Sequence, residues 1–112
     1  MFLSLINEFR QINNREPARY LNKILDDYCL AHTLAMVNRN GIYHAPACYL
    51  DGYAEIVGCY DYLGNFEDTI RFFLSELGSK YPEHKKILLD IQEIGYGIMV
   101  HQGRLYITIR GR

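Results

Sequence analysis

The sequence predicts a single α+β domain, and three observations carry that prediction. The chain has 112 residues, the size of one domain, and its 49% of hydrophobic residues are enough to bury one core. Apolar residues recur at helical spacing in several segments and alternate at strand spacing near the C-terminus. Helices that precede and flank a largely antiparallel sheet define the α+β class. No linker or internal repeat divides residues 1–112, so we expect one domain.

The N-terminal part is predicted to form two helices. The first covers residues 2–13, where apolar residues keep helical spacing: Leu3, Ile6, Phe9 and Ile12. Pro17 marks the connection that follows, and Asn22 suits the N-cap of a second helix. That helix is predicted to end at "NRNG", with Gly41 in the left-handed conformation that glycine adopts cheaply.

The middle of the chain, residues 42–64, has no helical spacing. Within it, "YAEIVGCY" indicates a short strand or extended segment between glycines. Asn65 then suits the N-cap of a third helix, which Gly78 is expected to close. Pro82 favours the first position of a short fourth helix.

The C-terminal stretch is predicted to be a β-hairpin. "EIGYGIMV" and "RLYITIR" are joined across "HQG", which is typical of a tight turn. Leu105, Ile107 and Ile109 alternate with Tyr106 and Thr108, so we expect one face of this strand to be buried.

Composition excludes several functional classes. The net charge is −1, the pI is about 6.4 and no basic stripe is present, so we expect no nucleic-acid partner. No apolar run is long enough for a transmembrane segment. The opening "MFLSLINEFRQ" is too short for a signal-peptide core, which leaves an intracellular protein or a mature or excised domain.

The three cysteines form an odd set without close spacing, which argues against a cysteine-based zinc site. Cys29 lies on an apolar helix face and is interpreted as a small core residue. Cys48 and Cys59 fall in the loop-rich middle and could pair in a secreted protein; the sequence leaves this open.

Four side chains at the ends of predicted elements could carry chemistry: His44, Glu55, Glu76 and His84. Two histidines and two carboxylates suit a metal such as zinc, and they equally suit an acid–base pair. His84 near a helix N-terminus should stay neutral, because the helix dipole disfavours its charged form. Taken singly, each residue is more commonly a structural or solvated polar group than a ligand.

The other histidines have simpler interpretations. His32 lies on the inner stripe of the second helix and is expected to be a hydrogen-bonded core histidine. His101 at the hairpin is expected to be solvated. The phenylalanines of the third helix are expected to pack in the core rather than to line a ligand site.

Six segments in order carry a family resemblance. They are "LINEFR" before Pro17, "ILDDYCLAHTLAMVNRNGIYHAP", "AEIVG", "FEDTIRFFLSE", "PEHKKILLD", and "EIGYGIMV" with "GRLYITI". Together they resemble the CAP superfamily (cysteine-rich secretory proteins, antigen 5 and pathogenesis-related proteins) in its compact bacterial SCP-like form. The chain departs from the family pattern where Phe73 replaces a tryptophan and "AEI" replaces "GEN". Its shortened loops predict a shallow, open cleft.

The resemblance implies an α-β-α sandwich, with a small antiparallel sheet between helix layers. It places the family's cleft tetrad on His44, Glu55, Glu76 and His84. In the family, the two histidines can hold a divalent metal, which implies His44 and His84 as ligands here, with zinc the first candidate. Relatives are mostly secreted, so the resemblance implies an extracellular protein.

Three functions follow as hypotheses. The first is a binding module whose cleft holds a divalent metal and a small-molecule, lipid or protein ligand. The second is a metal-dependent, peptidase-like hydrolase in which Glu55 and Glu76 would be catalytic. The third is a structural or interaction domain with a vestigial cleft. The sequence favours binding, because no nucleophilic Ser or Cys accompanies the tetrad and short loops leave few residues to position a substrate. It does not indicate the oligomeric state.

Overall fold

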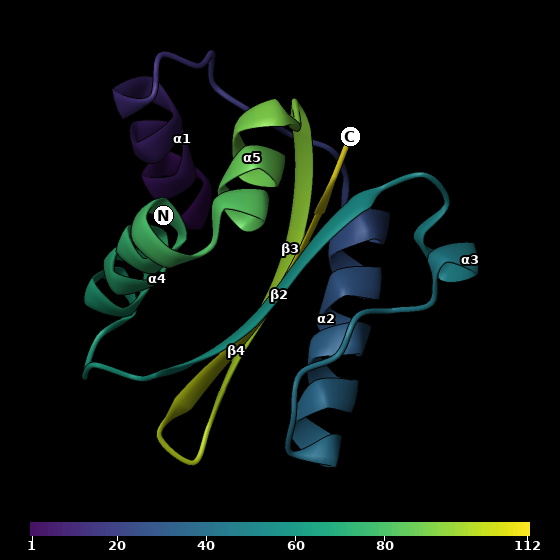
Figure 1. Cartoon of the computed structure of the whole chain (residues 1–112). Helices are drawn as coiled ribbons and strands as arrows, with labels where there is room; N and C mark the ends of the chain where they lie inside the picture. Colours follow the sequence, from purple (N-terminus) through teal and green to yellow (C-terminus); the bar gives the residue numbers. More distant parts are fainter.

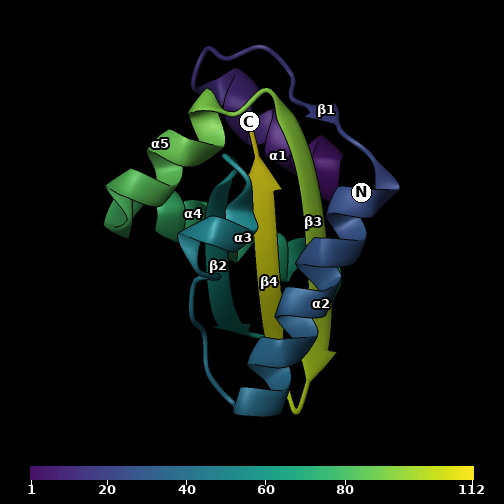
Figure 2. The same cartoon turned by 90° about the vertical axis from the view of Figure 1, so that its right-hand side faces the viewer.

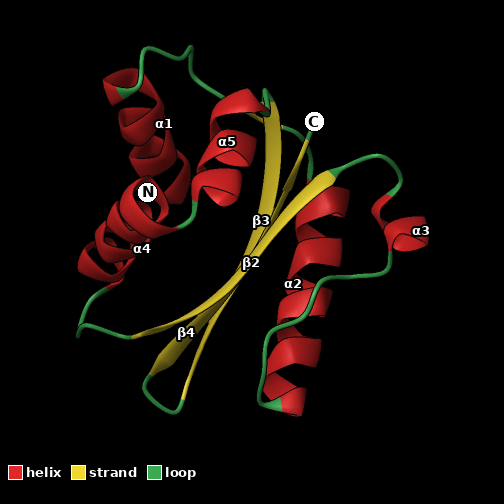
Figure 3. Ribbon diagram, viewed as in Figure 1, coloured by secondary structure: helices red, strands yellow, loops and turns green.

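A sheet of four strands separates two helix layers in the computed structural model, which describes residues 1–112 (Figures 1 and 3). The long helix α2 covers one face of the sheet, and α1, α4 and α5 cover the other, as the view turned by 90° also shows (Figure 2). The elements are α1 (Phe2–Ile12), β1 (Arg19–Tyr20), α2 (Lys23–Arg39), α3 (Ala47–Leu50), β2 (Ala54–Asp61), α4 (Phe66–Lys80), α5 (Pro82–Asp90), β3 (Glu93–His101) and β4 (Arg104–Gly111). The expected α-β-α sandwich is confirmed.

The strands follow the order β1-β3-β4-β2, which places β2 at one edge of the sheet. β4 pairs antiparallel with both β2 and β3. The sheet is not wholly antiparallel, because the two-residue β1 pairs parallel with β3. Two residues are too few to show a strand period, so no pattern in the sequence indicates β1.

The hairpin between β3 and β4 turns on two residues. Gln102 and Gly103 both have positive φ, 51° and 74°, the conformation of a turn whose twist matches the strands it joins. His101 is exposed, as expected, but it still belongs to β3. The predicted hairpin is therefore confirmed, with a loop shorter than "HQG".

Both faces of β4 are buried, so the expectation of one buried face was incomplete. Leu105, Ile107 and Ile109 pack into the larger core with α1, α4 and α5. Tyr106 and Thr108 point to the opposite face, where α2 covers them. Each has at most 3% of its surface exposed. A polar Thr108 fits there because its hydroxyl and the hydroxyl of Thr33 in α2 are hydrogen-bonded at 2.8 Å.

The predicted helix starts are confirmed by their caps. The side chain of Asn22 accepts a hydrogen bond from the backbone of α2, and that of Asn65 accepts one from the backbone of α4, both at 2.8 Å. Pro82 is the first residue of α5. Each asparagine cap satisfies an N–H group that the helix itself leaves unpaired.

Two predicted helix ends differ from the structure. At the end of α2, Asn40 takes the left-handed conformation instead of Gly41, with φ 62°. Asparagine tolerates this region, and the N–H of Gly41 still closes the helix by donating to Met36 O. α4 continues past Gly78 to Lys80, because Pro82 is what disfavours helical backbone at Tyr81.

Cys29 and His32 occupy structural positions, whereas Cys48 is exposed. Cys29 is fully buried, which confirms the core interpretation, and burial raises the pKa of its thiol to about 12. Cys48 and Cys59 are both free, so the structure contains no disulfide between them. His32 is half-buried and its Nε2 donates to Tyr43 O at 2.7 Å. No helix is long and apolar enough to cross a membrane.

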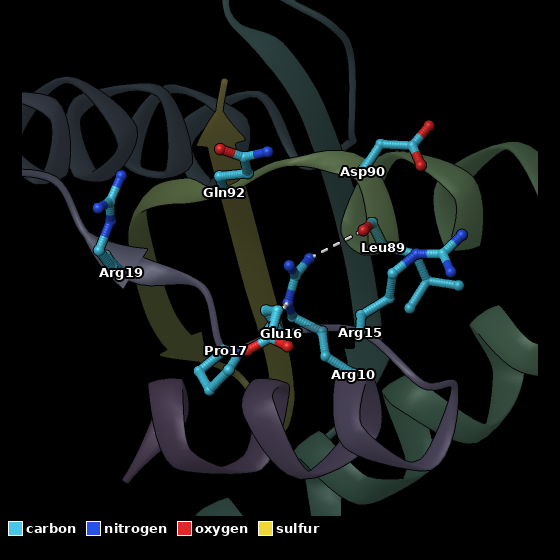
Figure 4. A pocket seen from close by; sticks show the side chains of 8 residues that line it. All are labelled: Arg10, Arg15, Glu16, Pro17, Arg19, Leu89, Asp90 and Gln92. Carbon is cyan, nitrogen blue, oxygen red and sulfur yellow. Dashed lines mark hydrogen bonds between the residues drawn. The ribbon is translucent and has the colours of Figure 1, made fainter.

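Arg10 fastens α1 to the connection between α5 and β3 (Figure 4). Its Nη1 donates to the carbonyls of Leu88, Leu89 and Ile91 at 2.7, 3.1 and 2.7 Å, and its Nε donates to Glu16 O at 2.8 Å. Only 3% of Arg10 is exposed, and burial lowers the pKa of its guanidinium. One side chain thus binds four backbone carbonyls, three at the end of α5 and one in the segment that follows α1.

Gly97 of β3 lies directly against the backbone of α2. A Cβ there would overlap Leu30 and Cys29. We therefore expect Gly97→Ala to reduce the free energy of unfolding by roughly 1–3 kcal/mol in urea titrations, because the helix must move off the sheet. Gly78→Ala is the matched control, since a Cβ there meets open space and alanine favours helix by about 1 kcal/mol. Equal stability of Gly97→Ala and the wild type would contradict this close packing.

Candidate functional site

The four predicted site residues come from four segments around the edge strand β2. His44 lies in the loop between α2 and α3, and Glu55 is the second residue of β2. Glu76 belongs to α4, and His84 to the first turn of α5. The structure brings three of them together: His44 Nδ1 is 2.9 Å from Glu55 Oε1, and the rings of His44 and His84 have centroids 6.5 Å apart.

Glu55 is buried and both of its oxygens are occupied. Oε1 accepts hydrogen bonds from His44 Nδ1 at 2.9 Å and from the backbone N–H of Ala45 at 3.0 Å. Oε2 accepts from Arg110 Nε at 2.9 Å. The side chains of Glu55 and Arg110 are 1% and 8% exposed. Glu55 is therefore buried with both oxygens hydrogen-bonded, and Arg110 neutralises its charge.

Sequence reasoning missed Arg110, although it holds the site together. β2 pairs with β4 so that Glu55 lies directly opposite Arg110. A facing carboxylate and guanidinium form a stabilising cross-strand pair. The signal was present as an arginine inside an apolar strand, but its meaning depended on a register that the sequence does not display.

The contact with Glu55 fixes the tautomer of His44. A carboxylate oxygen only accepts hydrogen bonds, so His44 Nδ1 must carry the proton in this contact. In the neutral ring, Nε2 then has a free lone pair. The His44 side chain is 55% exposed. This lone pair is thus available to a ligand at the protein surface.

His84 lies beside His44 and is stacked on Tyr81. The Tyr81 and His84 rings have centroids 5.7 Å apart at an angle of 21°. Burial and the neighbouring His44 lower the pKa of His84, and Glu83 opposes them. The predicted neutral state thus agrees with this direction, although burial and His44 are its causes rather than the helix dipole. The surface therefore presents His84 as an imidazole that favours the uncharged form.

Glu76 does not join the other three residues through any hydrogen bond. Its Oε1 accepts from Lys80 Nζ at 3.5 Å. Its Oε2 lies 3.2 Å from the same ammonium group but is buried without a hydrogen bond. Glu76 also acts on Tyr60, whose pKa rises to about 12 through burial, Tyr81 and Glu76. Glu76 therefore belongs with Tyr60 and Tyr81, which sequence reasoning did not single out.

The donor chemistry of the two histidines suits a divalent metal better than their present spacing does. Imidazole nitrogens are good ligands for zinc. Two rings that share a tetrahedral zinc, however, have centroids about 5 Å apart, given Zn–N distances of about 2.0–2.1 Å. The observed centroid distance is 6.5 Å, and no group of three or more His, Cys, Asp or Glu side chains that could hold an ion is formed. A shared ion would require the rings to turn toward each other.

His44 lies at the surface, with 55% of its side chain exposed, whereas its partner Glu55 is buried. Five cavities of about 260–640 Å³ lie elsewhere on the molecule, and none is lined by His44, Glu55, Glu76 or His84. A ligand at the exposed ring of His44 would consequently remain partly in water.

The lowered pKa of His84 gives a direct test of this geometry. NMR titration should place the pKa of His84 below its ordinary value of 6.5, and His44→Ala should raise it by removing a neighbouring positive charge. Glu83→Gln should lower it further. Because the folded chain binds this proton less tightly than the unfolded chain, the contribution of His84 to stability falls as pH drops below 6.5. A pKa above 6.5 in the wild type would contradict the arrangement.

Comparisons with known proteins support the fold. No family model and no curated protein sequence matches the chain. Among solved structures, an outer surface protein from Borrelia burgdorferi has a TM-score of 0.71 at 17% identity, over 98% of this chain and 88% of that one. An extracellular SCP-domain protein from Bacillus anthracis has a TM-score of 0.64 at 18% identity, over 99% of this chain.

A cysteine-rich secretory protein from Staphylococcus aureus has a TM-score of 0.52 at 16% identity, again over 99% of this chain. The chain spans only 39% and 37% of the Bacillus and Staphylococcus proteins. These likenesses establish a CAP-like fold, in agreement with the motifs of the sequence. At such low identity, they establish the fold alone.

Proposed function

We propose that this CAP-like domain is a binding module whose recognition surface centres on His44 and His84. The observation that carries the proposal is the complete hydrogen bonding of Glu55, whose two oxygens take up His44, Ala45 and Arg110. A carboxylate in this state orients the imidazole that it contacts. Its role is therefore to present His44 to a partner.

The recognition surface offers the lone pairs of two imidazole rings. His44 Nε2 is free of the contact with Glu55 and His84 favours the neutral form, so both rings can accept hydrogen bonds from a small-molecule, lipid or protein ligand. The same lone pairs can hold a divalent ion, zinc above all, once the rings turn toward each other. When bound, the ion would supply a positive charge for an oxygen atom of the ligand, while Glu55 keeps His44 in its tautomer.

The alternative, a metal-dependent hydrolase, has less support from the two carboxylates. Glu55 has no free oxygen, and Glu76 has no hydrogen bond to either histidine. A general base must be within reach of the water whose proton it takes. The arrangement of these two carboxylates therefore favours binding over catalysis.

An extracellular location is part of the proposal. Its support comes from the similar structures, which are described as an outer surface, an extracellular and a secretory protein. Fractionation of the source cells with an antibody against the domain tests it. Signal confined to the cytoplasm would remove this part of the proposal.

Calorimetric titration with zinc tests the surface itself. We expect a single-site heat for the wild type and its loss in both His44→Ala and His84→Ala. His101→Ala is the matched control, because His101 is an exposed histidine at the far end of β3 and should leave the heat unchanged. Absence of heat in the wild type would remove the metal from the proposal.

A hydrolysis screen separates the module from the enzyme. With zinc present, the wild type should not turn over peptide, ester or glycan substrates. Zinc-dependent turnover that Glu55→Gln abolishes would replace the binding module with the hydrolase. If His44→Ala and His84→Ala bound zinc and a panel of ligands as the wild type does, the result would instead favour a structural or interaction domain with a vestigial cleft.

A further inference from the structure

A cavity separate from the His44–His84 surface has Arg110 in its wall. It measures about 420 Å³ and lies between the start of α2, the short helix α3 and the end of β4. Its lining is mostly apolar, and the residues that matter here are Ile24, Tyr28, Tyr49, Leu50, Tyr53 and Arg110. None of the side chains of α3 is buried, and Figure 1 shows α3 set apart from the sheet. The space beneath α3 is thus left open by the fold.

Arg110 presents unused hydrogen-bond donors to this cavity. Its side chain is 8% exposed, and only Nε is hydrogen-bonded within the protein, to Glu55. The sole buried side-chain polar atom without a partner in the molecule is Glu76 Oε2. The two terminal nitrogens of Arg110 must therefore be reached by solvent, and the cavity that Arg110 lines supplies the route.

The free edge of Arg110, formed by its two terminal nitrogens, is suited to bind a carboxylate. Two parallel N–H groups of a guanidinium match the two oxygens of a carboxylate. A dianion is disfavoured, because Glu55 already pairs with Arg110 and Asp51 lies on the cavity wall. Arg112, whose guanidinium lies 5.5 Å from the centre of the Tyr53 ring, adds positive charge beside that tyrosine. The two arginines and the two carboxylates balance, so a ligand with one negative charge leaves a smaller excess of charge than a dianion does.

The rest of the cavity lining is suited to bind an aromatic ring of the ligand. Three tyrosines, Tyr28, Tyr49 and Tyr53, line the cavity together with aliphatic side chains. Aromatic rings prefer to pack against one another in offset or edge contacts. The cavity volume of about 420 Å³ falls within the range of roughly 300–1,000 Å³ of small-molecule sites.

We propose that this cavity binds a small aromatic monocarboxylate, with the carboxylate on the free edge of Arg110 and the ring among the three tyrosines. The site is separate from the His44–His84 surface and does not depend on the function proposed for it. The two meet at Glu55, which pairs with Arg110 on one side and His44 on the other.

Protection of Cys48 from alkylation tests the proposal on the wild-type chain. Cys48 is exposed and lines the cavity, whereas the half-buried Cys59 lies elsewhere and serves as an internal reference. The probe is 3-phenylpropanoate, and 3-phenylpropanamide is its uncharged match. At ten times its Kd, the acid should slow iodoacetamide modification of Cys48 about tenfold, since only about one cavity in eleven stays empty. The rate at Cys59, followed by mass spectrometry, should not change.

Two variants extend the test. Glu55→Gln with Arg110→Gln removes both charges together, so no buried charge is left unpaired, and it should abolish protection by the acid. Ile24→Trp fills the rim at a side chain that is 67% exposed, so it should weaken protection without unfolding the chain. Circular dichroism confirms the fold of each variant.

The wild-type comparison decides the proposal even if a variant fails to fold. Equal protection by the acid and the amide would overturn the role of Arg110. Protection by inorganic phosphate as strong as that by the acid would overturn the ligand class. No protection by the acid would overturn the site.

Discussion

Arg110→Met should reduce the free energy of unfolding by roughly 3–5 kcal/mol, because it leaves Glu55 as a buried charge without its cation. The side chain of Glu55 is only 1% exposed, so its carboxylate stays buried when Arg110 is removed. Methionine has a similar length and fills most of the space, so the loss reports the charge rather than a void. Urea unfolding followed by circular dichroism measures the difference.

Two controls isolate the buried pair. Glu55→Gln combined with Arg110→Met removes both charges and should recover most of the lost stability. Arg71→Met breaks the contact between Arg71 and Glu8, whose side chains are 48% and 50% exposed, and should cost no more than about 1 kcal/mol. If Arg110→Met cost as little as Arg71→Met, the Glu55–Arg110 pair would not be the buried centre of the site.

Arg10→Met should reduce the free energy of unfolding by about 2–4 kcal/mol, because several carbonyls lose their only side-chain donor. Figure 4 shows Arg10 rising from α1 to the end of α5, where these carbonyls gather. Removing the guanidinium also removes the cost of burying its charge, which keeps the net loss below that of Arg110. The same urea titration gives the measurement.

A conservative substitution and a matched control test the interpretation of Arg10→Met. Arg10→Lys keeps the charge but loses the planar set of donors, so it should restore only part of the stability. Arg15→Met changes an exposed arginine that lines the same surface cavity as Arg10 and should stay within about 0.5 kcal/mol of the wild type. Similar losses for Arg10→Met and Arg15→Met would show that Arg10 does not fasten α1 to α5 and β3.

The parts of the fold that depend on local chemistry could be predicted from the sequence. Asn22 and Asn65 cap helices through their own side chains, and Pro82 fixes a helix start through its ring. β1 and α3 could not be predicted, because two and four residues cover only about one strand or helix period, too few for a pattern to repeat. α3 also buries no side chain, so no apolar pattern marks it.

The residues of the candidate site also differ in how far the sequence could predict them. His44 and Glu55 were identified from their positions at element ends and from the family resemblance, and the structure places them in contact. Arg110 could not be found in this way, because its partner is set by the pairing of β2 with β4. Glu76 was grouped with the histidines, yet its hydrogen bond goes to Lys80. Spacing along the sequence does not say which side chains of different helices and strands will meet.

The tautomer of His44 tests the central claim most directly. If Glu55 orients His44 for recognition, long-range ¹H–¹⁵N NMR of the neutral ring should show the proton on Nδ1 and a bare Nε2. His32 provides the opposite reference in the same spectrum, because its Nε2 donates to a carbonyl. A neutral His44 with its proton on Nε2 would contradict the account, since the lone pair offered to a ligand would then point into the protein.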